Sequence, residues 1–221
     1  MSLQQKLDVL RDHLQVRTRS DALVAMLRVM EDAVSSDRAI KALQAAGRAP
    51  AFTLPDERDK PVSLADTLND GPVVMVFYRG DWCPWCTQEL AALQAVAGQF
   101  EQLGASVLAV SPQKSLHNRR CVRKHKLGFP ILHDAGGHVA AQYGVNWDIP
   151  ANLRKLYLGL NVDLTKFNGD EDWTLPLPAR YLIDQKQSVV YAEINASESH
   201  RMNPAGLLTA LESLQRKAPP H

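Results

Sequence analysis

Residues 73–86 read VVMVFYRGDWCPWC: an apolar run, a short turn and a Cys-x-x-Cys pair in succession. The β-branched and uncharged residues from Val73 to Phe77 predict a strand that is covered on both faces. After Cys86, apolar residues recur at helical spacing as far as Phe100 with no internal proline, which predicts an α-helix. The two cysteines therefore fall at a strand-to-helix junction.

This position favours thiol chemistry. The first N–H groups of a helix have no intrahelical partner, and with the helix dipole they stabilise a thiolate relative to a thiol. Cys83 and Cys86 are three residues apart, which on a first helical turn is close enough for a small disulfide. The sequence thus predicts a pair that cycles between dithiol and disulfide.

Composition limits the class of protein. The chain has 221 residues, of which 45% are hydrophobic and 22% charged, as in an ordinary folded globular protein. Its 25 basic and 24 acidic side chains give a net charge of +1, so we expect neither nucleic acid nor a membrane as partner. The N-terminus lacks a secretory pattern and no apolar run is long enough to span a bilayer, so we expect a cytoplasmic location. The basic stretch Lys114–Lys126 is either a solvated helix face or a binding patch.

The pattern of apolar residues changes near Ala49. Residues 1–48 predict an N-terminal helical arm, with leucines at helical spacing, that packs on the main domain or forms a homodimer contact. Residues 49–221 alternate short apolar runs with helical stretches, the pattern of an α/β domain. We predict strands near 73–78, 106–111, 179–184 and 188–194, and helices near 86–103, 113–126, 136–142 and 204–215. The segment 146–171 predicts an irregular insertion with one short helix around Leu153–Leu160.

Several motifs occur in a characteristic order: APAFTLPD (49–56), FYRGDWCPWC (77–86), LAVSP (108–112), FPILHD (129–134), YGV (143–145) and YLID (181–184). With this set, the segment from Ala49 to Leu214 resembles the peroxiredoxin-like branch of the alkyl hydroperoxide reductase / thiol-specific antioxidant family. The resemblance implies a thioredoxin-like central mixed sheet flanked by helices, here with the N-terminal helical extension. It also implies antioxidant oxidoreductase activity.

The family's active-site motif is only partly present. Typical peroxiredoxins carry Pro-x-x-x-Thr-x-x-Cys, whose cysteine attacks peroxide, and a distant arginine; laid onto this sequence, the attacking cysteine falls on Cys86. Cys83 occupies the threonine position, Arg79 the position of the first proline, and Pro178 that of the distant arginine. Two of the three partners that polarise a peroxide are therefore replaced.

The replacements resemble thioredoxins and glutaredoxins, in which a Cys-Pro-aromatic-Cys pair, here Cys83-Pro84-Trp85-Cys86, lies against a cis proline. Pro178 is the candidate for that proline, the alternative being an ordinary trans proline in a loop. On this interpretation Cys83 is the more exposed sulfur and attacks a disulfide, and Cys86 resolves the mixed disulfide. On the peroxiredoxin interpretation Cys86 becomes a sulfenic acid and Cys83 condenses with it.

Other side chains are candidates for supporting the dithiol. Arg79 and Arg180 are the cations that would lower a thiol pKa, and Trp82 and Trp85 either shield the thiolate or form local packing. Asp81 would oppose thiolate formation if it lay close. Cys121 is either a second resolving cysteine for Cys86 or a structural helix cysteine.

We expect no cofactor and no metal, because a structural zinc site usually has a second paired knuckle and none is spaced that way. The leading hypothesis is an enzyme, a thiol-dependent antioxidant oxidoreductase. A hydroperoxide would oxidise Cys83 and Cys86, and a thioredoxin- or glutathione-type donor would reduce them. One alternative is a thioredoxin-like protein disulfide reductase with Cys83 as nucleophile. The other is a non-catalytic redox sensor or scaffold.

Overall fold

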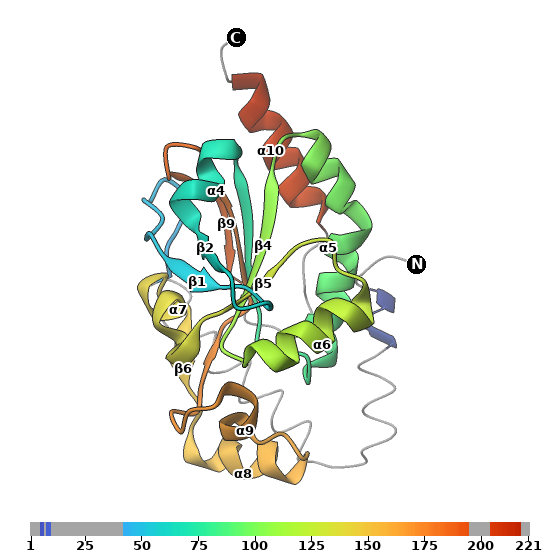
Figure 1. Ribbon diagram of the computed structural model, residues 1–221, viewed down its shortest axis with the longest axis vertical. Helices are drawn as coiled ribbons and strands as arrows, with labels where there is room; N and C mark the ends of the chain where they lie inside the picture. Colours follow the sequence, from blue (N-terminus) through green and yellow to red (C-terminus); the bar gives the residue numbers. More distant parts are fainter. Residues whose placement is uncertain (1–4, 7, 10–41, 195–203, 218–221) are drawn as a thin grey trace.

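The computed structural model of the chain describes residues 5–6, 8–9, 42–194 and 204–217 (Figure 1). Most of the predicted helical arm lies outside these residues, so the domain boundary between residues 48 and 49 stays a prediction. The described end of the arm packs on the body of the molecule: Ala42 is buried, and the Leu43 N–H donates to the Tyr143 carbonyl at 2.9 Å.

A five-stranded mixed sheet forms the centre, with strand order β5-β4-β3-β8-β9. β4 lies parallel to both β3 and β5, whereas β8 is antiparallel to β3 and to β9. The strands are β3 (Val73–Phe77), β4 (Ser106–Ser111), β5 (Ile131–His133), β8 (Ala179–Ile183) and β9 (Val189–Ile194). The sequence predicted all of these strands except β5, whose three residues are too few to show a period.

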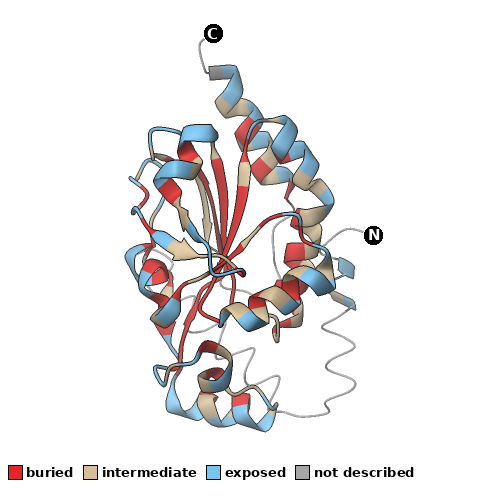
Figure 2. Ribbon diagram, in the orientation of Figure 1, coloured by how far each residue is buried: buried red, intermediate tan, exposed pale blue. Residues whose placement is uncertain are grey.

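The central strand β3 is buried on both faces, as predicted. Val73, Met75 and Phe77 belong to one apolar cluster, and Val74 and Val76 to a second, because successive side chains of a strand point to opposite faces. Figure 2 shows the inner strands of the sheet coloured as buried along most of their length.

Helices cover both faces of the sheet, which confirms the predicted architecture. α5 (Pro84–Gln102), α6 (Ser115–His125) and α10 (Ala205–Lys217) contribute to the second cluster and lie on the right in Figure 1. α4 (Leu64–Asp70) and α7 (His138–Gln142) contribute to the first cluster on the left. No helix in the described part of the chain is both long enough and apolar enough to cross a membrane.

The segment after β5 is more ordered than the sequence predicted. It contains β6 (Asn146–Asp148), α8 (Ala151–Gly159), α9 (Leu164–Asn168) and β7 (Thr174–Pro176), with β6 and β7 paired antiparallel. The predicted short helix around Leu153–Leu160 is present as α8. The irregular remainder of the prediction is wrong, because two three-residue strands and a five-residue helix leave no periodic signal. Figure 1 shows α8 and α9 below the end of the sheet at which α5 begins.

Three smaller elements complete the fold. They are the hairpin strands β1 (Thr53–Pro55) and β2 (Pro61–Ser63) and the 3-10 turn η1 (Ala135–Gly137).

Candidate active site

The Cys-x-x-Cys pair lies where β3 passes into α5. Cys83 is the N-cap of this 19-residue helix and Pro84 is at its start, a position where the missing N–H of proline costs nothing. The Cys83 Sγ accepts a hydrogen bond from the Cys86 N–H at 3.3 Å, and both cysteines are reduced. The helix N-terminus thus holds one sulfur in the geometry that stabilises a thiolate.

Both sulfurs are covered. Cys83 is 2% exposed and Cys86 is 0% exposed, so both are buried and the thioredoxin interpretation, with Cys83 as the more exposed sulfur, gains little from this difference. The reason for this burial is α8, which the sequence did not place over the helix start. The surroundings are not purely apolar, because the charged side chains of Arg79, Arg180 and Glu89 are also nearly fully buried at this end of the sheet.

Trp82 and Tyr157 form the cover over the dithiol. Their rings meet edge to face at 5.5 Å, and Trp82 also contacts Phe167 of α9 at 6.4 Å. Tyr157 of α8 is 1% exposed. Burial raises the pKa of Tyr157 to about 12, the Arg79 cation lowers it, and the nearby Cys83 and Cys86 raise it. The hydroxyl therefore stays protonated at neutral pH and can donate a hydrogen bond at the dithiol.

Arg79 is 1% exposed and lies in the loop that connects β3 to the dithiol. Its backbone carbonyl accepts a hydrogen bond from the Ser111 hydroxyl at 3.4 Å. Its side chain acts electrostatically on Tyr157 together with both cysteines, so the structure brings Arg79, Tyr157 and the dithiol together. A buried cation in this position favours the thiolate.

Arg180 also faces α5, but it is paired with acidic groups. It lies opposite Val76 in the register of β3 and β8. Its Nε is 2.6 Å from Glu89 Oε1, and its Nη1 is 4.0 Å from Glu193 Oε2. Glu89 follows Cys86 by one helical turn, so much of the Arg180 charge is compensated before it acts on the sulfur. Its effect on the thiol pKa stays a prediction.

Cys121 lies on α6 near the same site and is 0% exposed. Burial raises the pKa of Cys121 to about 12, Asp81 and Cys86 raise it, and a hydrogen bond with Tyr78 lowers it. Burial likewise raises the pKa of Tyr78, with smaller effects of Cys121, Asp81 and Cys86. Tyr78 is therefore close to both Cys86 and Cys121. A thiol held so firmly protonated is a weak nucleophile, which favours Cys83 as the partner of Cys86.

A buried polar network fixes the loop before the dithiol. The Gln113 Nε2 donates to the Tyr78 hydroxyl at 3.0 Å and to Asn118 Oδ1 at 2.7 Å, and Gln113 Oε1 accepts from the Asp81 N–H at 2.9 Å. Both amide side chains are 0% exposed. No role in the site was predicted from the sequence for four residues: Gln113, Asn118, Tyr157 and Glu89. The sequence held one signal for Gln113, which follows the predicted strand 106–111. The carboxyl ends of parallel strands lie at the same edge of a sheet, so Gln113 could be expected near the cysteines that follow the strand 73–78.

The charge of Asp81 is balanced by α6. Arg120 Nη2 lies 2.6 Å from Asp81 Oδ2, and the Arg120 Nε donates to the same oxygen at 2.8 Å. The sequence left open whether Asp81 opposes thiolate formation. This ion pair compensates part of the carboxylate charge.

Two further residues predicted to support the dithiol, Trp85 and Pro178, are buried. Trp85 is 4% exposed within the second apolar cluster, facing away from solvent. Pro178 is buried directly before β8. The described residues contain no cis peptide bond, so the expected cis proline of thioredoxins is not formed at Pro178. No group of three or more His, Cys, Asp or Glu side chains within the described residues is placed to hold a metal ion.

Part of the chain is similar in sequence to named proteins. It is 36% identical over 104 residues to a chloroplastic peroxiredoxin Q of Sedum lineare, covering 47% of this chain and 55% of that protein. It is 37% identical over 101 residues to a chloroplastic peroxiredoxin Q of Arabidopsis thaliana, covering 46% of each. The chain thus spans about half the length of these curated relatives.

Structural similarity to known proteins covers more of the chain than sequence similarity does. The crystal structure of peroxidoxin BcpB from Mycobacterium tuberculosis superimposes with a TM-score of 0.62 at 24% identity, over 80% of this chain and 99% of that one. This likeness confirms the predicted thioredoxin-like fold. Residues 45–192 match the model of the AhpC/TSA family. The family resemblance predicted from the motifs is confirmed, and the chain belongs to the AhpC/TSA family.

Proposed function

We propose that the chain is a thiol-dependent peroxidase in which a hydroperoxide oxidises Cys86 and Cys83 to a disulfide. One observation carries this proposal. Both sulfurs lie at the start of α5 beneath Trp82 and Tyr157, with exposures of 2% and 0%. A protein disulfide would have to reach a covered sulfur in line, whereas a small peroxide needs only a narrow opening.

The reaction balances with the residues present. The Cys86 thiolate attacks the terminal peroxide oxygen, so that an S–O bond forms, the O–O bond breaks and Cys86 becomes a sulfenic acid. The alkoxide or hydroxide that leaves takes up one proton. The Cys83 thiol then attacks the sulfenic sulfur, which forms the disulfide and releases water. A dithiol donor of thioredoxin type, or two molecules of a glutathione-type thiol, returns both cysteines to the reduced state.

Two buried groups take the place of the missing family residues. Arg79 supplies the positive charge that favours the Cys86 thiolate, and Tyr157 supplies the hydroxyl that donates to the peroxide or to the leaving oxygen. Arg79 and both cysteines act electrostatically on the Tyr157 hydroxyl, so these groups lie close together. The dipole at the start of α5 also favours a thiolate at Cys86, while the N–H of the first turn bonds to Cys83 Sγ.

Peroxide consumption by the purified protein tests the proposal, with a thioredoxin system in one assay and glutathione in another. We expect turnover with at least one donor, its loss in Cys86→Ser, and a sulfenic acid that accumulates on Cys86 in Cys83→Ser. Dimedone labelling and mass spectrometry detect that acid. A Cys86→Ser protein that still forms a sulfenic acid on Cys83 and turns over peroxide would contradict the assignment.

One observation favours a second candidate, a protein disulfide reductase. The Cys83 Sγ, not that of Cys86, accepts the N–H of the first turn at 3.3 Å, which favours Cys83 as the thiolate. Insulin reduction in parallel with the peroxide assay separates the two candidates. Activity with insulin alone, lost in Cys83→Ser, would support the reductase. Activity with neither substrate would support a redox sensor.

A further inference from the structure

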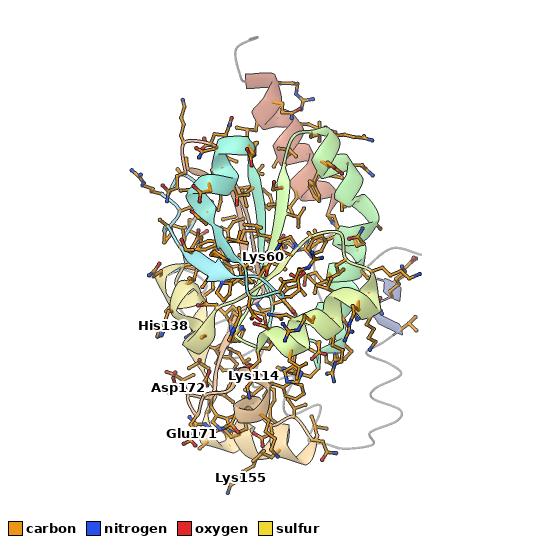
Figure 3. The ribbon with its side chains drawn as sticks, in the orientation of Figure 1. Lys60, Lys114, His138, Lys155, Glu171 and Asp172 are labelled. Atoms are coloured by element: carbon orange, nitrogen blue, oxygen red, sulfur yellow. The ribbon has the colours of Figure 1, made fainter. Side chains whose placement is uncertain are left out.

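The outer face of α6 carries positive charge that the dithiol chemistry does not use. The helix contains no acidic side chain, and its last turn includes Arg123 and Lys124, with Lys126 directly after it. All three are exposed, and none of them has a carboxylate partner in the described part of the chain. Lys114 precedes the helix and lies against Gly169, so it is not counted with them (Figure 3). Three uncompensated cations therefore gather at the C-terminal end of α6.

Two arginines extend this charge along the helix. Arg119 Nη1 lies 3.1 Å from Asp59 Oδ2, and Arg120 Nη2 lies 2.6 Å from Asp81 Oδ2. The arginine side chains are nevertheless 42% and 57% exposed. Because a guanidinium has five N–H donors in a planar fork, each of them can bind a second carboxylate from outside the molecule.

An apolar side chain lies among these cations. Leu116 is 62% exposed, the most of any large hydrophobic residue in the described part of the chain. It shares one side of α6 with Arg120 and Arg123, four and seven positions later. An apolar centre with a charged rim is the usual anatomy of a protein interface. The phosphates of a nucleic acid would pair with the cations but offer no apolar contact to Leu116, and one leucine is little surface for insertion into a membrane. The basic face of α6 is defined by six residues: Leu116, Arg119, Arg120, Arg123, Lys124 and Lys126.

The basic face borders the loop that leads to the dithiol. Arg120 holds Asp81, two positions before Cys83. Both sulfurs are buried, so a reductant reaches them only while their cover is open. A protein bound at the basic face stays beside this loop, so its thiol is present at a high effective concentration whenever the cover opens. A small free thiol such as glutathione gains no such advantage.

We propose that the basic face of α6 docks the protein that reduces the Cys83–Cys86 disulfide, and that this protein presents carboxylates around an apolar side chain. The inference rests on the thiol cycle of the proposed function. A thiolate of the docked protein attacks one sulfur of the disulfide, so that the S–S bond breaks and a mixed disulfide forms. The second thiol of the donor then displaces the chain from that mixed disulfide. The donor loses two electrons and two protons, and the two cysteines gain them.

Charge removal tests the docking surface. The disulfide is formed with diamide, without peroxide, and its reduction by a thioredoxin with an acidic surface is followed through NADPH consumption by thioredoxin reductase. At low ionic strength we expect the second-order rate constant to fall about tenfold in Arg123→Gln/Lys124→Gln, and the wild-type rate to fall as salt is added. Lys186→Gln/Arg216→Gln is the control, because it removes one lysine and one arginine charge at exposed positions after β8 and on α10. In the control, and with glutathione as donor in both variants, we expect changes within about twofold.

The apolar centre is tested separately. We expect Leu116→Ser to lower the rate with thioredoxin about fivefold to tenfold, a typical effect of losing one apolar contact, and to leave its salt dependence unchanged because no charge is altered.

The outcomes separate this proposal from the peroxidase proposal. If peroxide does not oxidise the reduced wild-type protein, the peroxidase proposal fails, whereas the diamide-formed disulfide still tests docking. Equal thioredoxin rates in wild type and Arg123→Gln/Lys124→Gln, an equal loss in the control variant, or no reduction of wild type by thioredoxin would overturn the docking surface. Binding of a DNA duplex or of anionic lipid vesicles that is lost in Arg123→Gln/Lys124→Gln, with the thioredoxin rate unchanged, would also overturn it and assign the face to that ligand.

Discussion

Arg79 is the largest side chain among the fully buried residues, with 1% exposure. Burying a guanidinium costs several kcal/mol unless charged or polar groups compensate it. Its position beside Tyr157 and the dithiol suggests that a thiolate is one of those groups.

We expect Arg79→Met to raise the pKa of the reactive thiol by about one unit or more, because removal of a nearby cation disfavours the thiolate. The pH dependence of alkylation by iodoacetamide should shift to higher pH by the same amount. Ultraviolet absorbance of the thiolate in Cys83→Ser and Cys86→Ser backgrounds measures each sulfur alone.

Arg180 provides the matched control. Its charge is compensated by Glu89 at 2.6 Å, so removing both partners in Arg180→Met/Glu89→Gln should change the thiol pKa less than Arg79→Met does. The single variant Arg180→Met would leave a buried carboxylate unpaired, which costs about 3–5 kcal/mol of stability. A larger pKa shift in the double variant than in Arg79→Met would assign the cationic role to Arg180.

Tyr157 is tested by removing one oxygen atom. We expect Tyr157→Phe to lower kcat/KM for hydrogen peroxide about tenfold to a hundredfold, the usual loss when a hydrogen bond to a charged group disappears. Tyr143→Phe is the control, because Tyr143 is as buried as Tyr157 and belongs to the same apolar cluster, but its hydroxyl donates to the Pro50 carbonyl at 3.2 Å. Equal activity of the two variants would exclude a role for the Tyr157 hydroxyl.

At the scale of elements, the loop between β3 and α5 depends on Gly80. This residue has φ of +157°, and an added Cβ would lie 2.5 Å from Trp82 Nε1 and 2.9 Å from Gln113 Oε1. Gly80→Ala therefore has to displace Trp82, the network of Gln113, or both.

We expect Gly80→Ala to expose the dithiol. A strain of about 1–3 kcal/mol at this position corresponds to an increase of about fivefold to a hundredfold in the opened form. The rate of reaction with dithionitrobenzoate should rise accordingly. Gly98→Ala is the control, because nothing lies within 4 Å of an added Cβ there and alanine is favoured in a helix by about 0.5–1 kcal/mol. Unchanged thiol reactivity in Gly80→Ala would mean that Trp82 does not limit access.

The elements that the sequence predicted are those with a clear period. β3 and α5 carry five or more residues in a continuous pattern, and their junction placed the dithiol. β1, β2, β6 and β7 have three residues each, too few for any period to show. α4 was also not predicted. The Ser63 side chain accepts the Asp66 N–H as the N-cap of this helix, but seven residues are too few to show a clear helical period beside that cap.

At the scale of the whole molecule, the site is made by contacts between distant parts of the chain. Arg180 and Glu89 are 91 positions apart, and Tyr157 reaches the dithiol from an inserted segment. The position of the dithiol at the start of α5 could be predicted from the sequence, because it depends only on residues adjacent to Cys83 and Cys86 in the chain. The cover by α8 could not, since it depends on how the insertion folds back over the end of the sheet. The same long-range packing buries both sulfurs.

The half-buried carboxyl group of Glu193, beside Arg180, links the stability of the whole molecule to pH. Burial raises the pKa of Glu193 from 4.5 to about 7, Arg180 lowers it, and Glu89 raises it. Between pH 4.5 and about 7 the folded protein thus holds a proton at Glu193 that the unfolded chain has released. The contribution of this group to the free energy of unfolding is full below pH 4.5 and is lost as pH rises through about 7.

We expect Glu193→Gln to remove this contribution to the pH dependence, because glutamine does not ionise. The decline in Tm between pH 4.5 and 7 should therefore be smaller in Glu193→Gln than in wild type when both are followed by calorimetry. Glu171→Gln makes the same change of net charge at an exposed position (Figure 3) and should keep the wild-type profile. If Glu193→Gln and Glu171→Gln gave identical profiles, Glu193 would titrate alike in the folded and unfolded chain. The cluster of Arg180, Glu89 and Glu193 would then be open to water.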